Sequence, residues 1–246
     1  MEFVESSLAE RVAAVRAEIA RACQRAGRAP ESVTLVAVSK THPPARIVEA
    51  IAAGIHDFGE NRPEEARPKM DAVAALSPEP IRWHMIGHVQ RRKARLVTRG
   101  YALLHSLDSL RLAERLDRAL AEQGRALDVL LQFNVSGEAT KEGWDAYQWE
   151  NRPAQRAAIW REVEAILALP NLRVRGLMTM APIVDDPEAT RPVFAALRSL
   201  RDALRETFPA AAWDELSMGM TDDYPVAIEE GATLVRIGRA IFGARR

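Results

Sequence analysis

The sequence of 246 residues contains one cysteine, Cys23. A single cysteine cannot form a disulfide bond within the chain, and it excludes a zinc site built from several thiolates. Such sparing use of cysteine is typical of a reducing compartment, so we expect a cytoplasmic protein. Cys23 continues an apolar helical stripe, and we therefore interpret it as a small buried residue. The stripe consists of Leu8, Val12, Val15, Ile19 and Cys23.

Net charge and long apolar runs are also missing. Lysine plus arginine and aspartate plus glutamate both number 34, so no net charge attracts nucleic acid or an acidic membrane. No stretch approaches the ~18 apolar residues of a membrane span, and residues 1–7 lack the basic start and apolar core of a leader. We expect a soluble, unprocessed monomer whose partner is a small molecule rather than nucleic acid or a membrane.

One apolar run, from Leu35 to Val38, continues through Ser39 and ends abruptly in Lys40. An unbroken apolar run followed by a proline-containing breaker indicates a strand covered on both faces, as in a parallel sheet. Lys40 then lies at the carboxyl end of the strand, where α/β proteins bind their ligands. Partial desolvation there favours the uncharged amine, a candidate nucleophile for a carbonyl carbon. A lysine after a strand can equally be a solvated loop residue, so support has to come from elsewhere.

Strand and helix patterns alternate along the chain after a first helix, which is capped by Ser6 or Ser7 and ends near Gly27. About eight strand-then-helix units follow without a linker, so we predict a single domain over residues 1–246. Its predicted fold is a (β/α)8 TIM-type barrel with an extra N-terminal helix. Because strand order cannot be read from one sequence, a doubly wound open sheet is the alternative. The expected strands cover about 33–39, 55–61, 81–87, 101–106, 127–134, 174–180, 213–219 and 233–238, and the expected helices about 43–53, 62–76, 88–98, 108–123 (capped by Asp108), 153–168, 187–207 and 222–230.

Polar side chains and glycines stand at the carboxyl ends of the expected strands. In a barrel these ends meet at one mouth, so the residues there are candidates for a joint binding site. Serine and asparagine are also common helix caps and glycine permits turns, so only their joint presence favours a site. The candidates are Lys40, Asn61, His84, Gly87, Ser106, Asn134, Met178, Ser217, Gly219, Arg236 and Gly238.

The last two strand ends indicate a phosphate site, because barrels frequently bind phosphate on the loops after strands seven and eight. Asp222 and Asp223 would repel an anion after the seventh strand. The backbone N–H groups of Gly238, Arg239 and Ala240, at the start of a final helix, have no such competitor. A phosphate there, with a lysine amine across the barrel, describes a site for a phosphorylated cofactor that carries an aldehyde, such as pyridoxal 5'-phosphate (PLP).

Seven motifs, in order and spread over nearly the whole chain, resemble the pyridoxal phosphate homeostasis protein family. The resemblance implies a barrel like that of alanine racemase, PLP as the cofactor and intracellular PLP homeostasis as the function. Position 239, often a small hydroxyl residue in that family, is arginine here, and the segment 144–152 is longer than usual. The motifs are Val38-Ser39-Lys40, Phe58-Gly59-Glu60-Asn61, the run from Trp83 to Lys93, His105-Ser106-Leu107-Asp108, Gly176-Leu177-Met178, the run from Leu216 to Met220, and Val235-Arg236-Ile237-Gly238.

The resemblance assigns roles to some of these residues. It implies that Lys40 holds PLP as a Schiff base and that Arg236 faces the pyridine nitrogen. It also implies that Ser217 and Gly238 contact the phosphate, whereas only the backbone N–H of Arg239 is an expected donor. Motif positions without an assigned role are Asn61, His84 and Met220. The cofactor-binding set that we predict is Lys40, Asn61, His84, Ser106, Met178, Ser217, Met218, Gly219, Arg236, Gly238 and Arg239, with no catalytic residue and no metal ligand.

An arginine at the ring nitrogen bears on turnover. A guanidinium only donates hydrogen bonds, so it keeps the ring nitrogen unprotonated and weakens the cofactor as an electron sink. A racemase also needs a second acid or base on the opposite face of the cofactor, usually a tyrosine, and Tyr101, Tyr147 and Tyr224 lie at no expected strand end. We therefore expect a PLP carrier or buffer without turnover, with apo-enzymes as potential recipients. A PLP-dependent amino-acid racemase is the alternative, and the continuous resemblance disfavours a barrel aldolase that uses Lys40.

Two further patterns are expected to be structural. His84 and His88 are four residues apart, but we place one at a strand end and the other at a helix start, with no third ligand nearby, so we expect no metal site. The basic run at 91–95 favours a solvated helix face over a contact with nucleic acid. The roles of Lys141 and of the irregular segment 136–152 stay open.

Overall fold

Eight parallel strands close into a ring in the computed structural model, which describes residues 6–243. The ring runs through β1, β2, β3, β4, β5, β7, β8 and β9 and returns to β1, while the two-residue strand β6 (Trp144–Asp145) pairs with β5 beyond it. The closed ring confirms the predicted (β/α)8 barrel, and the alternative of an open sheet is wrong. The other strands are β1 (Thr34–Val38), β2 (Asp57–Glu60), β3 (Arg82–Met85), β4 (Leu103–Leu107), β5 (Leu127–Asn134), β7 (Leu172–Met178), β8 (Glu215–Ser217) and β9 (Leu234–Ile237).

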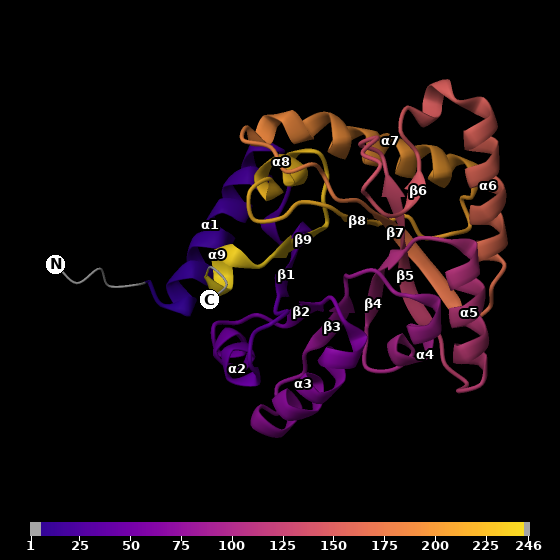
Figure 1. The fold of residues 1–246 in the computed structure, drawn as a ribbon. Helices are drawn as coiled ribbons and strands as arrows, with labels where there is room; N and C mark the ends of the chain where they lie inside the picture. The colour runs from indigo at the N-terminus through magenta and orange to yellow at the C-terminus, as the bar shows by residue number, and fades with distance from the viewer. Residues whose placement is uncertain (1–5, 244–246) are drawn as a thin grey trace.

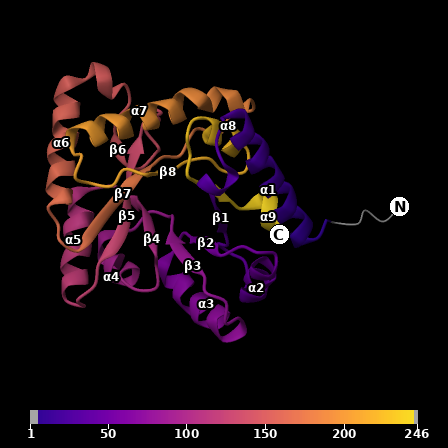
Figure 2. The ribbon, with the colours of Figure 1, turned by 180° about the vertical axis from the view of Figure 1, so that it is seen from behind.

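Helices surround the ring, as Figure 1 shows from one side and Figure 2 from behind. The predicted additional helix, α1 (Leu8–Arg25), precedes the first strand. The expected helix 88–98 is wrong in extent, because only η2 (Arg91–Lys93) and α4 (Ala94–Val97) form there. The expected cap Asp108 is also wrong, since α5 begins at Leu110 with Ser109 as its cap. The other helices are α2 (Pro44–Ala52), α3 (Pro63–Leu76), α5 (Leu110–Ala121), α6 (Pro153–Leu167), α7 (Arg191–Thr207), α8 (Tyr224–Glu229) and α9 (Arg239–Phe242), with the short 3-10 turns η1 (Pro30–Ser32), η3 (Trp149–Asn151) and η4 (Pro187–Thr190).

The barrel has a small inner layer and a large outer core. Successive residues of a strand point to opposite faces, so each strand contributes to both. The main core fills the shell between strands and helices. A separate apolar layer lies inside the ring, and buried polar side chains from several strands complete the interior. The inner layer consists of Val36, Leu103, Leu130, Met178 and Leu234.

The first and last helices of the fold are in contact. α1 begins at a capping box in which the Ser7 hydroxyl accepts from the Glu10 N–H and the Glu10 carboxylate accepts from the Ser7 N–H. Arg11 on α1 donates to the carbonyl of Ile241 in α9 at 2.7 Å, and α1 packs beside α8 and α9 (Figure 1). Cys23 is buried on α1, as predicted, and burial raises the pKa of its thiol.

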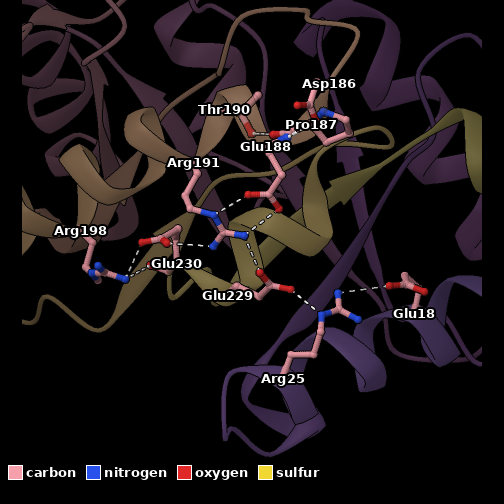
Figure 3. Close-up of polar contacts among 10 residues, drawn as sticks. All are labelled: Glu18, Arg25, Asp186, Pro187, Glu188, Thr190, Arg191, Arg198, Glu229 and Glu230. Carbon is pink, nitrogen blue, oxygen red and sulfur yellow. Dashed lines mark hydrogen bonds and ion pairs between the residues drawn. The ribbon is translucent and has the colours of Figure 1, made fainter.

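An ion-pair network fixes the segment that follows β7 (Figure 3). Arg191, the first residue of α7, donates to Glu188 and lies 2.7 Å from Glu229 and 3.0 Å from Glu230. Arg25 of α1 reaches the same Glu229 at 2.6 Å. η4 and the start of α7 are thereby connected to α8 and α1, which holds the connection after β7 at one edge of the barrel.

Among residues 6–243, no helix is long and apolar enough to cross a membrane. Residues 1–5, on which the expectation of no leader partly rests, lie outside the described part of the chain. The single domain over 1–246, the cytoplasmic location and the monomeric state stay predictions.

Candidate functional site

Lys40 is separated from β1 by Ser39 and lies at the end of the barrel where the strands finish. By the alternation of the strand it shares the inward face with Val36 and Val38. Val36 pairs with Arg236 on β9, and a Cβ atom on Gly238 would lie 3.5 Å from the Val38 Cβ. Lys40, Gly238 and Arg236 therefore lie on or just after two adjacent strands of one wall, and the expectation of a lysine across the barrel from the phosphate loop is wrong.

A buried ion pair supports the backbone beside Lys40. Lys69 of α3 donates to the Glu60 carboxylate at 2.7 Å and to the Ser39 carbonyl at 3.0 Å. The Ser39 hydroxyl donates to the same carboxylate at 2.7 Å. The Glu60 side chain is 2% exposed and that of Lys69 11%. Sequence analysis missed this pair as a functional support, although Glu60 stands in one of the motifs and a charged residue ending a buried strand is a usable signal.

Arg236 occupies the inside of the barrel, with its side chain buried. It donates to the Ser217 hydroxyl oxygen at 2.5 Å and to the Thr179 carbonyl at 2.9 Å. Burial lowers the pKa of Arg236 to about 10, partly offset by Asp223, so the guanidinium stays charged at neutral pH. The end of β8, through Ser217, and the turn after β7, through Thr179, thus hold the Arg236 guanidinium, which can only donate hydrogen bonds.

His84 and a second histidine, His105, connect Ser217 with Asp57. His84 contacts Asp57 at 2.8 Å and His105 at 2.9 Å, and His105 contacts Ser217 at 2.7 Å. His84 was among the predicted site residues. Its two partners, Asp57 and His105, were missed by sequence analysis. The inward position of His105 follows from β4, because Leu103 belongs to the inner layer and His105 is two residues further along the strand.

The loops after β8 and β9 lie against one another. Gly219 has a φ of +92°, and a Cβ atom there would lie 2.6 Å from the Ala227 Cβ, so only glycine fits this turn. The Arg239 side chain pairs with Asp222, which leaves its backbone N–H as the group available to a ligand. α9 has only four residues, so its dipole contributes little, and the N–H groups of its first turn remain the expected phosphate donors.

Three of the predicted residues do not present a polar side chain to the mouth. Ser106 donates to the Gly87 carbonyl at 2.6 Å and so ties two turns together. Met218 is buried in the outer core, and Met178 belongs to the inner apolar layer. Asn61 differs from them, because its Oδ1 atom is buried and accepts no hydrogen bond. That oxygen is an acceptor that a ligand could satisfy.

His88 has a different neighbourhood from the one expected. Its Nδ1 atom lies 2.8 Å from the Asp108 carboxylate, and Glu142 brings a third ligand atom within 4.8 Å of both. The expectation that no third metal-type ligand lies near this histidine is therefore wrong. Lys141 reaches from the loop after β5 to the Ala181 carbonyl at 3.3 Å, and so links two loops at the mouth.

Comparison with known proteins gives a family. The model of the alanine racemase N-terminal domain matches residues 11–246. The pyridoxal phosphate homeostasis protein of Pseudomonas aeruginosa is 45% identical over 240 residues, which cover 98% of this chain and 96% of that protein.

Solved structures of similar fold were also found. PipY of Synechococcus elongatus, in a structure with PLP bound, is 38% identical with a TM-score of 0.81, over 96% of this chain and all of that one. The D-threonine aldolase of Filomicrobium marinum shares the fold alone, at 19% identity and a TM-score of 0.67 over 92% of this chain and 59% of the aldolase. The chain therefore belongs to the pyridoxal phosphate homeostasis protein family.

Proposed function

We propose that this protein binds PLP and acts in intracellular PLP homeostasis, with Lys40 as the attachment point. The observation that carries the proposal is the shared barrel wall, on which Lys40 stands at the mouth and Arg236 lies deeper on the neighbouring strand. The names of the relatives and the PLP-bound PipY structure support the choice of cofactor.

The residues present fit the cofactor group by group. Arg236 is a buried donor that suits an unprotonated ring nitrogen. The first-turn N–H groups at Arg239 and Ala240 suit the phosphate, and the unsatisfied Oδ1 of Asn61 suits a donor on the bound molecule. Ser217 was expected at the phosphate, but its hydroxyl is engaged by Arg236 and His105, so we infer that its main task is to hold Arg236.

Bound PLP supplies an aldehyde and a conjugated ring. The Lys40 amine would be the group that attaches to this aldehyde. The protein's own contribution is to position that amine, through the Glu60 and Lys69 pair beneath it, and to keep a cation at the ring nitrogen. A carrier needs no more than this.

The second candidate function is turnover as a racemase. It needs a second acid or base, usually a tyrosine, and none of the three tyrosines is placed for that role. The Tyr101 side chain is buried, and burial, with nearby Glu60 and Glu64, raises the pKa of its hydroxyl. Tyr224 is buried in α8, and the exposed Tyr147 lies on the loop after β6. We therefore assign carriage of PLP without turnover, by a monomer that can release it to apo-enzymes.

Purified protein should be yellow, and the substitution Lys40→Ala should abolish the long-wavelength absorbance, because only attachment to an amine extends the conjugation of the bound aldehyde. Borohydride reduction followed by mass mapping should find the PLP adduct on Lys40. Lys141→Ala is the matched control, since Lys141 also reaches the mouth but is engaged by Glu138 and the Ala181 carbonyl. An adduct on Lys141 alone would defeat the assignment.

A further inference from the structure

Four hydrogen-bonded side chains cross the inside of the barrel from β2 to β8. Asp57 Oδ1 lies 2.8 Å from His84 Nε2, His84 Nδ1 lies 2.9 Å from His105 Nε2, and His105 Nδ1 lies 2.7 Å from Ser217 Oγ. All four residues are more than nine-tenths buried. Each of the three contacts must therefore share one hydrogen, because an unsatisfied polar atom at this depth is costly.

Arginines at both ends limit the direction of these bonds, since a guanidinium can only donate. Arg82 donates to the Asp57 carboxylate at 2.8 Å, and Arg236 donates to Ser217 Oγ at 2.5 Å. Burial raises the pKa of Asp57, but the bonds from His84 and Arg82 outweigh it and lower the pKa overall. The Asp57 carboxylate is thus an acceptor, and His84 donates to it through Nε2.

If both histidines are neutral, only one assignment of donors and acceptors satisfies all three contacts. When His84 is neutral its Nδ1 accepts from the Nε2–H of His105, and the Nδ1 of His105 accepts from the Ser217 hydroxyl. Burial, with the charges of His84 and Arg236, lowers the pKa of His105 well below its usual value, so this ring stays neutral. At rest both histidines therefore carry their hydrogen on Nε2, and all three bonds point from Ser217 toward Asp57.

We propose that Asp57, His84, His105 and Ser217 form a relay that receives one proton from the cofactor side of the barrel and holds it on His84 beside Asp57. The inference rests on the proposed function only in taking PLP as the molecule at Arg236. Asp57, His84 and His105 are positioning residues in this scheme, because they act on the cofactor through Ser217 and Arg236.

The transfer balances bond by bond. The incoming proton binds Ser217 Oγ, whose own hydrogen moves to His105 Nδ1, and the hydrogen on His105 Nε2 moves to His84 Nδ1. His84 then carries both hydrogens and a positive charge, His105 is neutral with its hydrogen on Nδ1, and Ser217 keeps a hydroxyl hydrogen that is no longer used by His105. That hydrogen can be donated to an acceptor on the cofactor near Arg236.

The surrounding charges favour His84 as the resting place. His84 faces the Asp57 carboxylate, whereas His105 faces His84 and Arg236 and has no carboxylate contact. Beyond the two ends, Asp223 lies near Arg236 and Glu215 near Arg82. PLP in solution carries dissociable protons on its ring nitrogen and phosphate, and a cation at the ring nitrogen requires that nitrogen to be unprotonated. The relay provides a destination for the proton that the cofactor loses.

Long-range proton–nitrogen correlation spectra of protein with labelled histidines test the relay without cofactor. Above neutral pH, His84 and His105, assigned by His84→Gln and His105→Gln, should both show the Nε2–H form. On acidification His84 should become the cation while His105 changes to the neutral Nδ1–H form, with the same midpoint. An exposed histidine simply becomes a cation, so the His105 change is diagnostic. A cationic His105, or an Nε2–H His105 beside a protonated His84, would overturn the proposal.

Asp57→Asn supplies a second test. Arg82 contacts both Asp57 oxygens, through Nη2 at 2.8 Å and through Nε at 2.7 Å. The amide has no charge, so a cationic His84 loses its partner, and the joint change of the two histidines should move to lower pH. Asp128→Asn on β5 is the matched control, because Asp128 is also held by arginines, Arg173 and Arg175, but has no histidine partner. Should Asp57→Asn fail to fold, the acid-dependent tautomers of His84 and His105 in the unaltered protein still show whether the relay exists. An unchanged midpoint of the joint histidine change in folded Asp57→Asn would contradict the scheme.

The link to the cofactor is measured as protons released when PLP is added to weakly buffered protein near neutral pH. Asp57→Asn should release about one more proton per bound PLP than the unaltered protein, and Asp128→Asn should match the latter. An equal release from all three would show that the relay takes no proton from PLP. If Lys40 forms no adduct, the proposed function fails by itself, while the tautomers of the ligand-free protein still judge the relay.

Discussion

Thr41, the residue after the attachment lysine, has a φ of +67°. β-branched residues rarely adopt this left-handed conformation, which costs roughly 1–2 kcal/mol. We predict that Thr41→Gly raises the free energy of unfolding by about 0.5–1 kcal/mol, because relief of the strain exceeds the added entropy of the unfolded chain. Urea unfolding measures the change, and the side chain is exposed, so little packing is lost.

Gln148→Gly is the matched control. Gln148 is the other non-glycine residue with positive φ among residues 6–243, at +49°, but it is not β-branched. Its substitution should stabilise less than that of Thr41. Equal or greater stabilisation by Gln148→Gly would mean that Thr41 is not specially strained. The strain is of interest because the Thr41 turn determines how Lys40 enters the mouth.

Single residues of the site were predictable where a motif or a strand end marks them. Lys40 and Arg236 stand on inward faces, as expected. A shift of one residue changes the face, and this accounts for Ser106, which ties two turns together while its neighbour His105 enters the relay. Asp57 was not predictable, because its role depends on a contact with His84 across two strands, and a single sequence carries no register.

At the scale of an element, α3 supports the end of β1 through Lys69. Lys69→Met would leave the Glu60 carboxylate buried with only the Ser39 hydroxyl as a partner. We predict a loss of about 3 kcal/mol in the free energy of unfolding, the usual result of breaking a buried ion pair from one side. PLP should also dissociate more readily, because the Ser39 carbonyl beside Lys40 loses its anchor.

Arg67→Met on the same helix is the matched control. Its partner is Asp71, and both side chains are about three-fifths exposed, at 59% and 62%. Such a surface pair contributes less than about 0.5 kcal/mol. The double substitution Lys69→Met with Glu60→Gln should recover part of the lost stability, because it removes the unpaired buried charge. Similar unfolding energies for the Lys69 and Arg67 variants would refute the supporting role of α3.

Elements followed their periodicity except where a helix start lacked both a side-chain cap and a proline. Strand β5 forms at the expected residues Leu127–Asn134, and the alternation of strands and helices is as predicted. The expected helix 88–98 is reduced to η2 and α4, and neither has a side-chain bond at its N-terminal cap. Helices α2, α3 and α6 also lack such a bond, but each begins with a proline, which suits the first helical position. The segment 88–98 has neither device, and the unsatisfied N–H groups of its start oppose a longer helix.

At the scale of the molecule, ring closure determines which residues meet. The pairing of β4 with β5 completes the barrel and brings side chains from β2, β3, β4, β8 and β9 to one interior. Strand order is not encoded in a local pattern, so the fold class could be predicted but the polar chain across the interior could not. The hydrogen bonds among these buried polar groups fix one arrangement of the interior.

The same arrangement limits chemistry on an amino acid. Removal of an α-hydrogen needs a base near the α-carbon and an electron sink in the cofactor. In the proposed function, Arg236 would hold the ring nitrogen unprotonated and so weaken the sink. Tyr101 and Tyr224 are buried, and the hydroxyl of the exposed Tyr147 lies 3.2 Å from the Gln148 amide. Barrel proteins of the same fold, such as the D-threonine aldolase, extend well beyond the part that this chain matches.

We therefore predict that the PLP-loaded protein exchanges the α-hydrogen of L- and D-alanine with solvent negligibly. Deuterium incorporation followed by proton NMR measures this, with an alanine racemase as the positive control and Lys40→Ala as the blank. Exchange at the rate of the racemase, lost in Lys40→Ala, would make the racemase alternative correct. Tyr147→Phe would then be the next variant, because Tyr147 is the only tyrosine whose side chain is exposed.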